Sequence, residues 1–203
     1  MPGGEVVHSA DGFSIEAIAV GSLDNNVYLI VDDATGAGVI VDAADDTDAI
    51  LGLIDSREVT AIVTTHGHRD HHRSAPAVAA ATGAPFLLHP ADDHIAGNVT
   101  TESLGTGRLM IGETMATIIH TPGHTPGSVC VALDGAVITG DTLFPGGPGA
   151  THFAYGSFPT IIESITTELF SLPDDTRVLP GHGNGTTIGA ERPSLDDWIR
   201  RGW

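Results

Sequence analysis

The sequence has 203 residues, with 26 acidic side chains against 8 basic ones, all arginine, so its formal charge is −18. Nucleic-acid binding depends on clustered basic side chains, and this composition therefore excludes nucleic acid as an expected partner. A single cysteine excludes an intramolecular disulfide, and no apolar run of about 18 residues is available to cross a membrane. We expect one cytoplasmic domain over residues 1–203, because no leader-like segment or linker interrupts the globular composition.

Short apolar runs closed by glycine, proline or aspartate predict many strands in the first half of the chain. The predicted strands cover residues 13–20, 27–32, 38–42, 60–65 and 86–89. Helical spacing over residues 46–56 predicts a first helix, and an alanine-rich run over 74–82, with Pro76 near its start, predicts a second. The turn at residues 24–26 makes the first two strands an antiparallel pair.

Strand character returns in the second half of the chain. The predicted strands lie within residues 108–121, 128–133, 136–139 and 177–179, and the predicted helices cover residues 159–172 and 194–201. Ser194 is placed to cap the last helix, and Cys130 falls within a strand expected to be buried. Two sheets, each covered by helices, would bury this pattern in one layered α/β domain.

The segment 62–72 combines a strand with a cluster of potential metal ligands. His66, His68, Asp70 and His71 stand within six residues, directly after the strand. Imidazole nitrogen and carboxylate oxygen suit zinc and similar divalent cations. A strand that ends in a glycine-containing loop brings several such groups together without a long loop to order, so two adjacent ions become feasible.

Three further ligand-type side chains follow strands in the same way. His124 comes after the run 118–123, Asp141 after 137–140 and His182 after 178–181, and each run ends in glycine. Glycine permits close backbone approach at these strand ends, where α/β folds commonly build sites. We expect these three residues to join the histidine cluster.

These motifs resemble the metallo-β-lactamase superfamily, whose HxHxDH signature corresponds to His66, His68, Asp70 and His71. The family's later His, Asp and His correspond to His124, Asp141 and His182, and its early strand-closing Asp corresponds to Asp42. The resemblance implies a four-layer αββα sandwich with metals at one edge between the sheets. We expect Asp42 to orient a neighbouring ligand or loop.

Within the superfamily, the strings at residues 121–128 and 140–144 are similar to glyoxalase II and its short bacterial relatives. That resemblance implies two metal ions, zinc foremost, with iron or manganese as alternatives. The implied ligands are His66, His68 and His124 for the first ion, Asp70, His71 and His182 for the second, and Asp141 as a bridge. A β-lactamase activity is not expected, because Cys130 occupies no motif position.

The corresponding activity is hydrolysis of a small-molecule acyl thioester by water whose pKa the two cations lower. Asp70 is expected to be catalytic, since it would bind the second ion and hold the proton of the attacking hydroxide. Glutathione carries two carboxylates, which usually find Lys or Arg; the chain has no Lys and ends 21 residues after His182, so a sugar thiol such as mycothiol is a second candidate carrier.

A loop rich in Gly and Pro over residues 145–159 follows Asp141 directly. Loops beside a site often form its pocket, and we expect substrate contacts there. The expected substrate-binding residues are Phe144, Gly147, His152 and Tyr155. The competing interpretation is a solvent-facing connection with one buried aromatic ring.

Two other activities and one local question stay open. A persulfide dioxygenase of the same superfamily would use a single iron held by His66, His124 and Asp141. Alternatively, metals would only stabilise a partner-binding domain. His72 is either a group supporting the ligands or a solvated helix residue, and the sequence leaves the oligomeric state unknown.

Overall fold

The computed structural model describes residues 4–97, 99 and 101–202. Its first sheet has seven strands in the order of the chain. They are β1 (Glu5–Ala10), β2 (Phe13–Val20), β3 (Asn25–Asp32), β4 (Gly38–Val41), β5 (Val59–Val63), β6 (Phe86–Leu88) and β7 (Glu102–Ser103). Strands β1 to β4 are antiparallel neighbours, whereas β4 to β7 run parallel, since helices connect β4 to β5 and β5 to β6.

The second sheet has six strands in the order β15-β14-β11-β10-β9-β8. They are β8 (Gly107–Ile111), β9 (Thr114–His120), β10 (Val129–Leu133), β11 (Ala136–Gly140), β14 (Arg177–Pro180) and β15 (Thr186–Thr187). The pair β12 (Leu143–Phe144) and β13 (Gly147–Pro148) forms a small separate ribbon. Only β11 and β14 are parallel in the second sheet as described, so their carboxyl ends meet at one edge.

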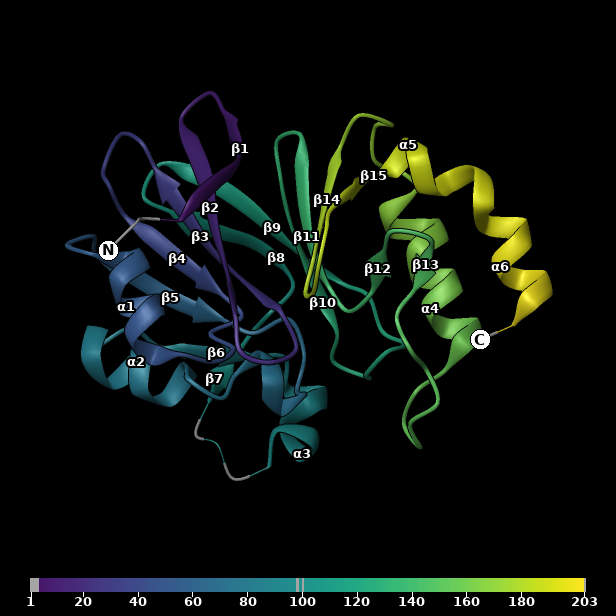
Figure 1. Ribbon diagram of the computed structural model, residues 1–203, viewed down its shortest axis with the longest axis horizontal. Coiled ribbons are helices and arrows are strands. Elements are labelled where there is room, and N and C mark those ends of the chain that lie inside the picture. Colours follow the sequence, from purple (N-terminus) through teal and green to yellow (C-terminus); the bar gives the residue numbers. More distant parts are fainter. Residues whose placement is uncertain (1–3, 98, 100, 203) are drawn as a thin grey trace.

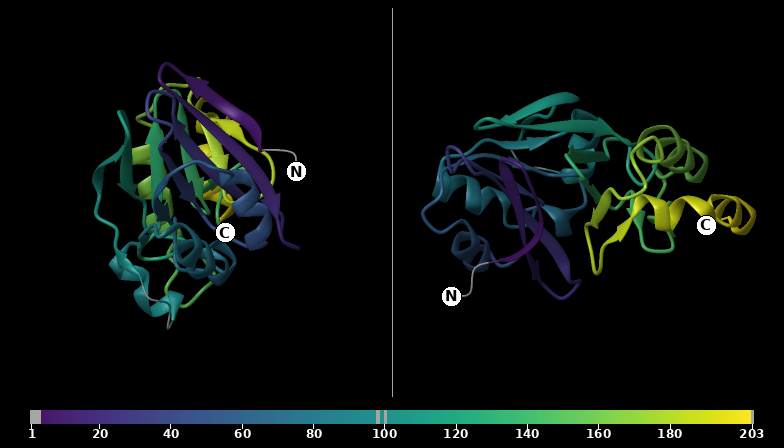
Figure 2. Two further views of the ribbon diagram at one scale, coloured as in Figure 1. Left: turned by 90° about the vertical axis from the view of Figure 1, so that its left-hand side faces the viewer. Right: turned by 90° about the horizontal axis from the view of Figure 1, so that it is seen from above.

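Helices cover the outer face of each sheet, which gives the predicted αββα sandwich (Figure 1). The longer ones are α1 (Thr47–Ile54), α2 (Ala75–Thr82), α4 (Phe158–Ser164), the π-helical turn Ile165–Leu169 that continues it, and α6 (Leu195–Arg201). Short helices α3 (Asp93–Ala96) and α5 (Ile188–Glu191) lie in the connections. Figure 2 shows the two halves from the side and from above, each sheet with its own helices.

The alternation of side chains in each strand produces three apolar layers. In β4, Val39 and Val41 face the core between the sheets, while Ile40 packs toward α1 and α2. In β10, Val131 faces the inner core and Cys130 is buried toward the helices of the second sheet, as expected for a small apolar strand residue. None of the helices in the described part of the chain is long and apolar enough to cross a bilayer.

The predicted strands and helices form, with boundaries shifted by one to three residues, the largest shift being the end of the helix predicted over 159–172 at Leu169. β1 and the short elements β7, β12, β13, β15, α3 and α5 were not predicted. β1 is an edge strand in which no side chain is buried, Val6 being 58% exposed, and its pattern carries no clear alternation. The Ser194 side chain makes no cap hydrogen bond, contrary to expectation, because α6 continues directly from a short 3-10 turn.

Candidate metal centre

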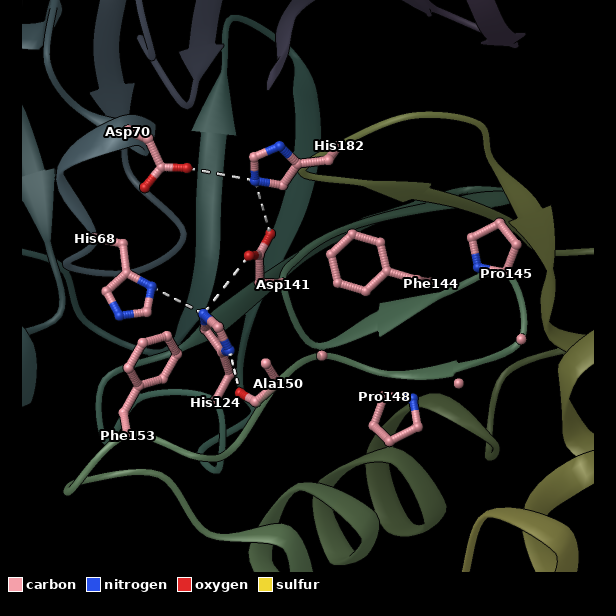
Figure 3. Close-up of a pocket in the computed structure, with 13 residues that line it drawn as sticks. His68, Asp70, His124, Asp141, Phe144, Pro145, Pro148, Ala150, Phe153 and His182 are labelled. Atoms are coloured by element: carbon pink, nitrogen blue, oxygen red, sulfur yellow. Dashed lines mark hydrogen bonds and ion pairs between the residues drawn. The ribbon is translucent and has the colours of Figure 1, made fainter. Parts of the chain in front are cut away.

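Seven side chains meet where β5, β9, β11 and β14 end. Figure 3 shows five of them, His68, Asp70, His124, Asp141 and His182. The seven side chains comprise all seven metal ligands expected from the sequence and fall into overlapping groups whose potential ligand atoms lie within 4.8 Å of one another. These groups are His66 with His68 and His124, Asp70 with His71 and His182, and His66 with His71 and Asp141. The structure therefore brings together residues separated by more than a hundred positions, and two of the three groups contain the residues expected around each ion. Their role as metal ligands stays a prediction.

The first set consists of three imidazoles. His68 Nδ1 lies 3.0 Å from His66 Nε2 and 2.9 Å from His124 Nε2. Metal–nitrogen bonds of zinc at tetrahedral angles separate two ligand atoms by about 3.3 Å. The nitrogens of this set therefore already stand at the spacing of ligands around one ion.

The second set combines a carboxylate with two imidazoles. His71 Nε2 lies 3.1 Å from His182 Nε2 and 3.5 Å from Asp70 Oδ2, and the Asp70 oxygen lies 3.4 Å from His182 Nε2. Asn25 donates a hydrogen bond to the same Asp70 oxygen at 3.1 Å. This set also has the spacing of ligands around a divalent cation.

Asp141 stands between the two sets. Its Oδ1 lies 3.4 Å from His71 Nε2 and 3.7 Å from His182 Nε2, and its Oδ2 lies 3.6 Å from His124 Nε2. Oδ1 is buried and has no hydrogen-bond partner among the residues that the structure describes. A buried carboxylate oxygen without a partner is costly, and a cation on either side would satisfy it. The donor set thus fits two divalent ions bridged by Asp141.

Each histidine presents one nitrogen to the cluster because its other nitrogen has a partner outside it. The Nδ1–H groups of His124 and His182 donate to the carbonyls of Ala150, at 2.7 Å, and Leu23, at 2.9 Å. His68 is reversed: its Nε2 lies 2.8 Å from the Tyr155 hydroxyl, leaving Nδ1 for the cluster.

Asp42 orients the remaining two imidazoles from the end of β4. Its carboxylate accepts from His71 Nδ1 at 2.9 Å and from the Thr65 backbone N–H and hydroxyl, at 2.7 and 2.8 Å. The Thr65 hydroxyl in turn lies 3.1 Å from His66 Nδ1. Asp42 lies outside the ligand groups, so the expectation that it orients a ligand and a loop is confirmed by these contacts.

Burial and neighbouring charges shift the histidine pKa values of the two sets in opposite directions. Burial and the neighbouring imidazoles hold the pKa of His66 well below its usual value and that of His68 at about 4. Burial also lowers the pKa of His124. Burial opposes the protonation of His71 as well, but the carboxylates of Asp141 and Asp42 outweigh it and raise the pKa of His71 to about 9. Without metal, burial therefore favours the neutral imidazoles of the first set, whereas the neighbouring carboxylates favour the protonated form of His71 in the second.

Glycines at the strand ends are needed for this convergence. A Cβ at Gly181, just before His182, would lie 2.5 Å from Asp141 Oδ1 and 2.6 Å from His71 Cε1. Gly140, just before Asp141, has φ +47°, and its Cβ would lie 2.4 Å from the Thr65 hydroxyl. Glycine is thus required for both positive φ and close approach.

A cavity of about 510 Å³ opens onto the cluster. Besides five of the ligands, its walls are Phe144, the segment 145–150 and Phe153, all uncharged. The expected substrate residues Phe144 and Gly147 lie on this wall. His152 does not, because its side chain is exposed and its ring packs on Phe153. Tyr155 is also absent from the wall and instead contacts His68; a substrate role for these residues stays a prediction.

Two supporting residues were missed or left open by the sequence. His72 is buried, and its Nε2 lies 3.2 Å from the Gly67 carbonyl, so the interpretation as a solvated helix residue is wrong. Asp92 is also fully buried and contacts both histidine-bearing loops. No metal-ligand spacing singles out Asp92 in the sequence, where it stands in the run Asp92-Asp93-His94.

An αββα sandwich with a cluster of histidine and aspartate side chains at the shared edge of its sheets is typical of metal-dependent hydrolases. The family model described as the Metallo-beta-lactamase superfamily matches residues 20–182, and the chain belongs to this superfamily.

Relatives match over nearly the whole chain. An uncharacterized protein of Mycobacterium leprae is 38% identical, with 88% of this chain and 95% of that protein covered. The hydroxyacylglutathione hydrolase GloC of Haemophilus influenzae is 31% identical, with 89% and 96% covered. The chain is thus similar to proteins with and without an assigned activity.

Solved structures of metallo-β-lactamase-fold proteins superpose on this chain over most of its length. BLEG-1 B3 metallo-beta-lactamase superposes with a TM-score of 0.81 at 30% identity, covering 88% of this chain and 96% of that one. TTHA1623, in a di-iron-bound form, gives 0.76 at 30%, covering 87% and 96%. ETHE1 from Myxococcus xanthus gives 0.79 at 28%, covering 88% and 81%.

Proposed function

We propose that this protein is a metal-dependent hydrolase of small-molecule acyl thioesters. The observation that carries the proposal is the position of Asp141, whose two oxygens face two separate three-residue ligand sets at the floor of an uncharged cavity. His66, His68 and His124 would hold one divalent ion, Asp70, His71 and His182 the other. Zinc is the first expectation, and the di-iron form of a structural relative makes iron the main alternative.

When bound, two such ions would supply the positive charge that lowers the pKa of water and polarises a carbonyl. The protein's own groups would position the reactants. Burial would raise the pKa of Asp70, but the His182 hydrogen bond, the charge of His71 and the Asn25 hydrogen bond hold that pKa well below its usual range. Its ionised carboxylate, fixed by the Asn25 hydrogen bond, would accept a hydrogen bond from the attacking water or hydroxide and hold it in position, while the proton released by that water would pass to solvent. A thiolate leaves without a proton donor, which suits a cavity that offers no dedicated acid.

The cavity wall bears on the carrier thiol. Apart from the ligands, the residues that line it offer only apolar side chains and backbone groups. Arg201 lies close behind Gly147 of this wall, with Nη2 3.4 Å from the position of a Cβ there. One cation near the wall, set against the two carboxylates of glutathione, favours a carrier with few negative charges, such as a sugar thiol. The name of the Haemophilus influenzae relative supports glutathione, so both carriers belong in the test.

The test is a panel of acyl thioesters of glutathione, coenzyme A and sugar thiols, assayed with the zinc, iron and manganese forms. We expect hydrolysis of at least one thioester, with Asp141→Asn reducing it by more than the 10–100-fold typical of groups that only support a ligand. Asp134→Asn is the matched control, because Asp134 is an exposed carboxylate on the turn before β11. No turnover above the Asp141→Asn level on any member would refute the proposal.

The second candidate is a mononuclear-iron persulfide dioxygenase, favoured by the structural likeness to ETHE1. It would need only His66, His124 and Asp141, and would leave Asp70 and His182 without a metal. Metal content separates the two activities. About two divalent ions per chain support hydrolysis, whereas one iron with oxygen uptake on a persulfide would support the dioxygenase.

A further inference from the structure

Asp92 is a buried carboxylate outside the ligand cluster. It closes the 3-10 turn Pro90–Asp92 and is fully buried. No salt bridge to it is present among the described residues, and hydrogen bonds satisfy both of its carboxylate oxygens. A buried carboxylate without a cation needs such donors, because its desolvation is otherwise costly.

The donors come from both loops of the first ligand set. Asp92 Oδ2 accepts from the Gly67 backbone N–H at 2.7 Å and from the Thr125 hydroxyl at 2.6 Å. Its Oδ1 accepts from the Gly127 backbone N–H at 2.6 Å. Gly67 lies between His66 and His68, and Thr125 directly follows His124. One carboxylate therefore connects the loop after β5, from the first sheet, to the loop before β10, from the second.

Gly67 and Gly127 pack so closely against Asp92 that neither position has room for a side chain. A Cβ at Gly67 would lie 2.9 Å from the Asp92 carbonyl oxygen, and one at Gly127 would lie 2.7 Å from Asp92 Cγ. The Gly67 peptide is also held at its carbonyl by His72 Nε2. Both loops therefore pack directly against Asp92, and its position sets their separation.

We propose that Asp92 is a positioning residue for the first metal set, which fixes the distance between His66 and His68 on one loop and His124 on the other. The proposal rests on the metal centre of the proposed function but on neither substrate nor reaction. The second set has contacts of its own: Asn25 bonds Asp70, and Asp42 bonds His71 while also reaching His66 through Thr65. Loss of Asp92 should therefore weaken the first set selectively.

The test compares Asp92→Asn with Asp93→Asn, an exposed neighbour at the start of α3 that serves as the matched control. The amide keeps the size of the side chain, but its NH₂ group cannot accept a hydrogen bond. Asp92→Asn therefore loses one of the three hydrogen bonds if the NH₂ replaces Oδ1 and two if it replaces Oδ2. Cobalt titration against a chelator gives the affinity of each set, and the cobalt absorption spectrum separates the three-histidine set from the carboxylate-containing one. Thermal unfolding of the metal-free proteins reports on folding itself.

We expect the first-set affinity of Asp92→Asn to fall about 10- to 100-fold, with the second set and Asp93→Asn unchanged. Unchanged affinity, or an equal loss at both sets, would overturn the proposal. If Asp92→Asn fails to fold, the variant Thr125→Val replaces it, because it removes one hydrogen-bond donor to Asp92. We expect this variant to lose metal affinity several-fold at the first set only. Wild-type affinity at the first set would refute the role of Asp92. Wild-type protein that binds two ions yet hydrolyses no thioester would refute the proposed function and leave this result standing.

Discussion

Each histidine of the cluster is oriented by a hydrogen bond at its second nitrogen. The hydrogen bond between His68 and Tyr155 is the easiest of these to remove by mutation. A ligand that binds through Nδ1 must carry its proton on Nε2, which the Tyr155 hydroxyl can accept at 2.8 Å. The Tyr155 ring also stacks on Phe153, with centroids 5.6 Å apart. The hydroxyl and the ring therefore have separable roles.

Removal of that hydroxyl should weaken the first metal set. We expect Tyr155→Phe to lower its affinity about tenfold, since the ring stays and only the hydrogen bond is lost. Tyr28→Phe is the control, because the Tyr28 hydroxyl donates to the Pro180 carbonyl, away from the first set. Calorimetric metal titration measures both variants, and an unaltered first-set affinity in Tyr155→Phe would contradict the role assigned to the hydroxyl.

The opposite pKa directions in the two sets predict different pH dependence of metal binding. His71, with a pKa of about 9 when no metal is bound, must lose a proton at neutral pH before Nε2 can bind a metal. The second-set affinity should therefore rise at least about tenfold per unit between about pH 6 and about pH 8. His68, with a pKa of about 4, is already neutral there, so the first set should be nearly flat. Equal slopes in titrations at several pH values would count against this.

At the scale of elements, the site depends on how strands end. Gly181→Ala would place a Cβ 2.5 Å from Asp141 Oδ1. The end of β14 must then move, and we expect more than a tenfold loss of second-set affinity and about 1–3 kcal/mol of destabilisation. Gly105→Ala is the control, since nothing lies within 4 Å of a Cβ there. Metal titration and thermal unfolding measure both effects; full second-set affinity would show that the strand end tolerates the methyl group.

Local patterns were enough to predict the longer core strands and helices and the seven residues that the structure brings together, because a His or Asp directly after an apolar run with glycine is a short-range signal. They could not predict Asp92, whose partner Gly67 is 25 positions away and is met only in the folded chain. The orientation of loop 145–157 also has no periodicity to follow. His152 was therefore expected at the cavity, where the structure has Phe153.

At the scale of the molecule, the formal charge of −18 surrounds a cavity whose wall is uncharged apart from the ligands. An anionic substrate approaches against this field, whereas a neutral one does not. We expect kcat/KM for a glutathione thioester to rise with added salt, as screening takes effect, and that for a neutral sugar thioester to stay constant. Parallel measurements at low and high ionic strength check this; a fall with salt for the anionic substrate would indicate a positively charged docking site instead.

Each sheet contributes part of the metal centre. His66 to His71 follow a strand of the first sheet, while His124, Asp141 and His182 follow strands of the second. Neither half of the sandwich holds a complete set, so a bound cation would add to the apolar core in holding the halves together. Supply of the cation would then raise the resistance of the protein to unfolding as well as its turnover.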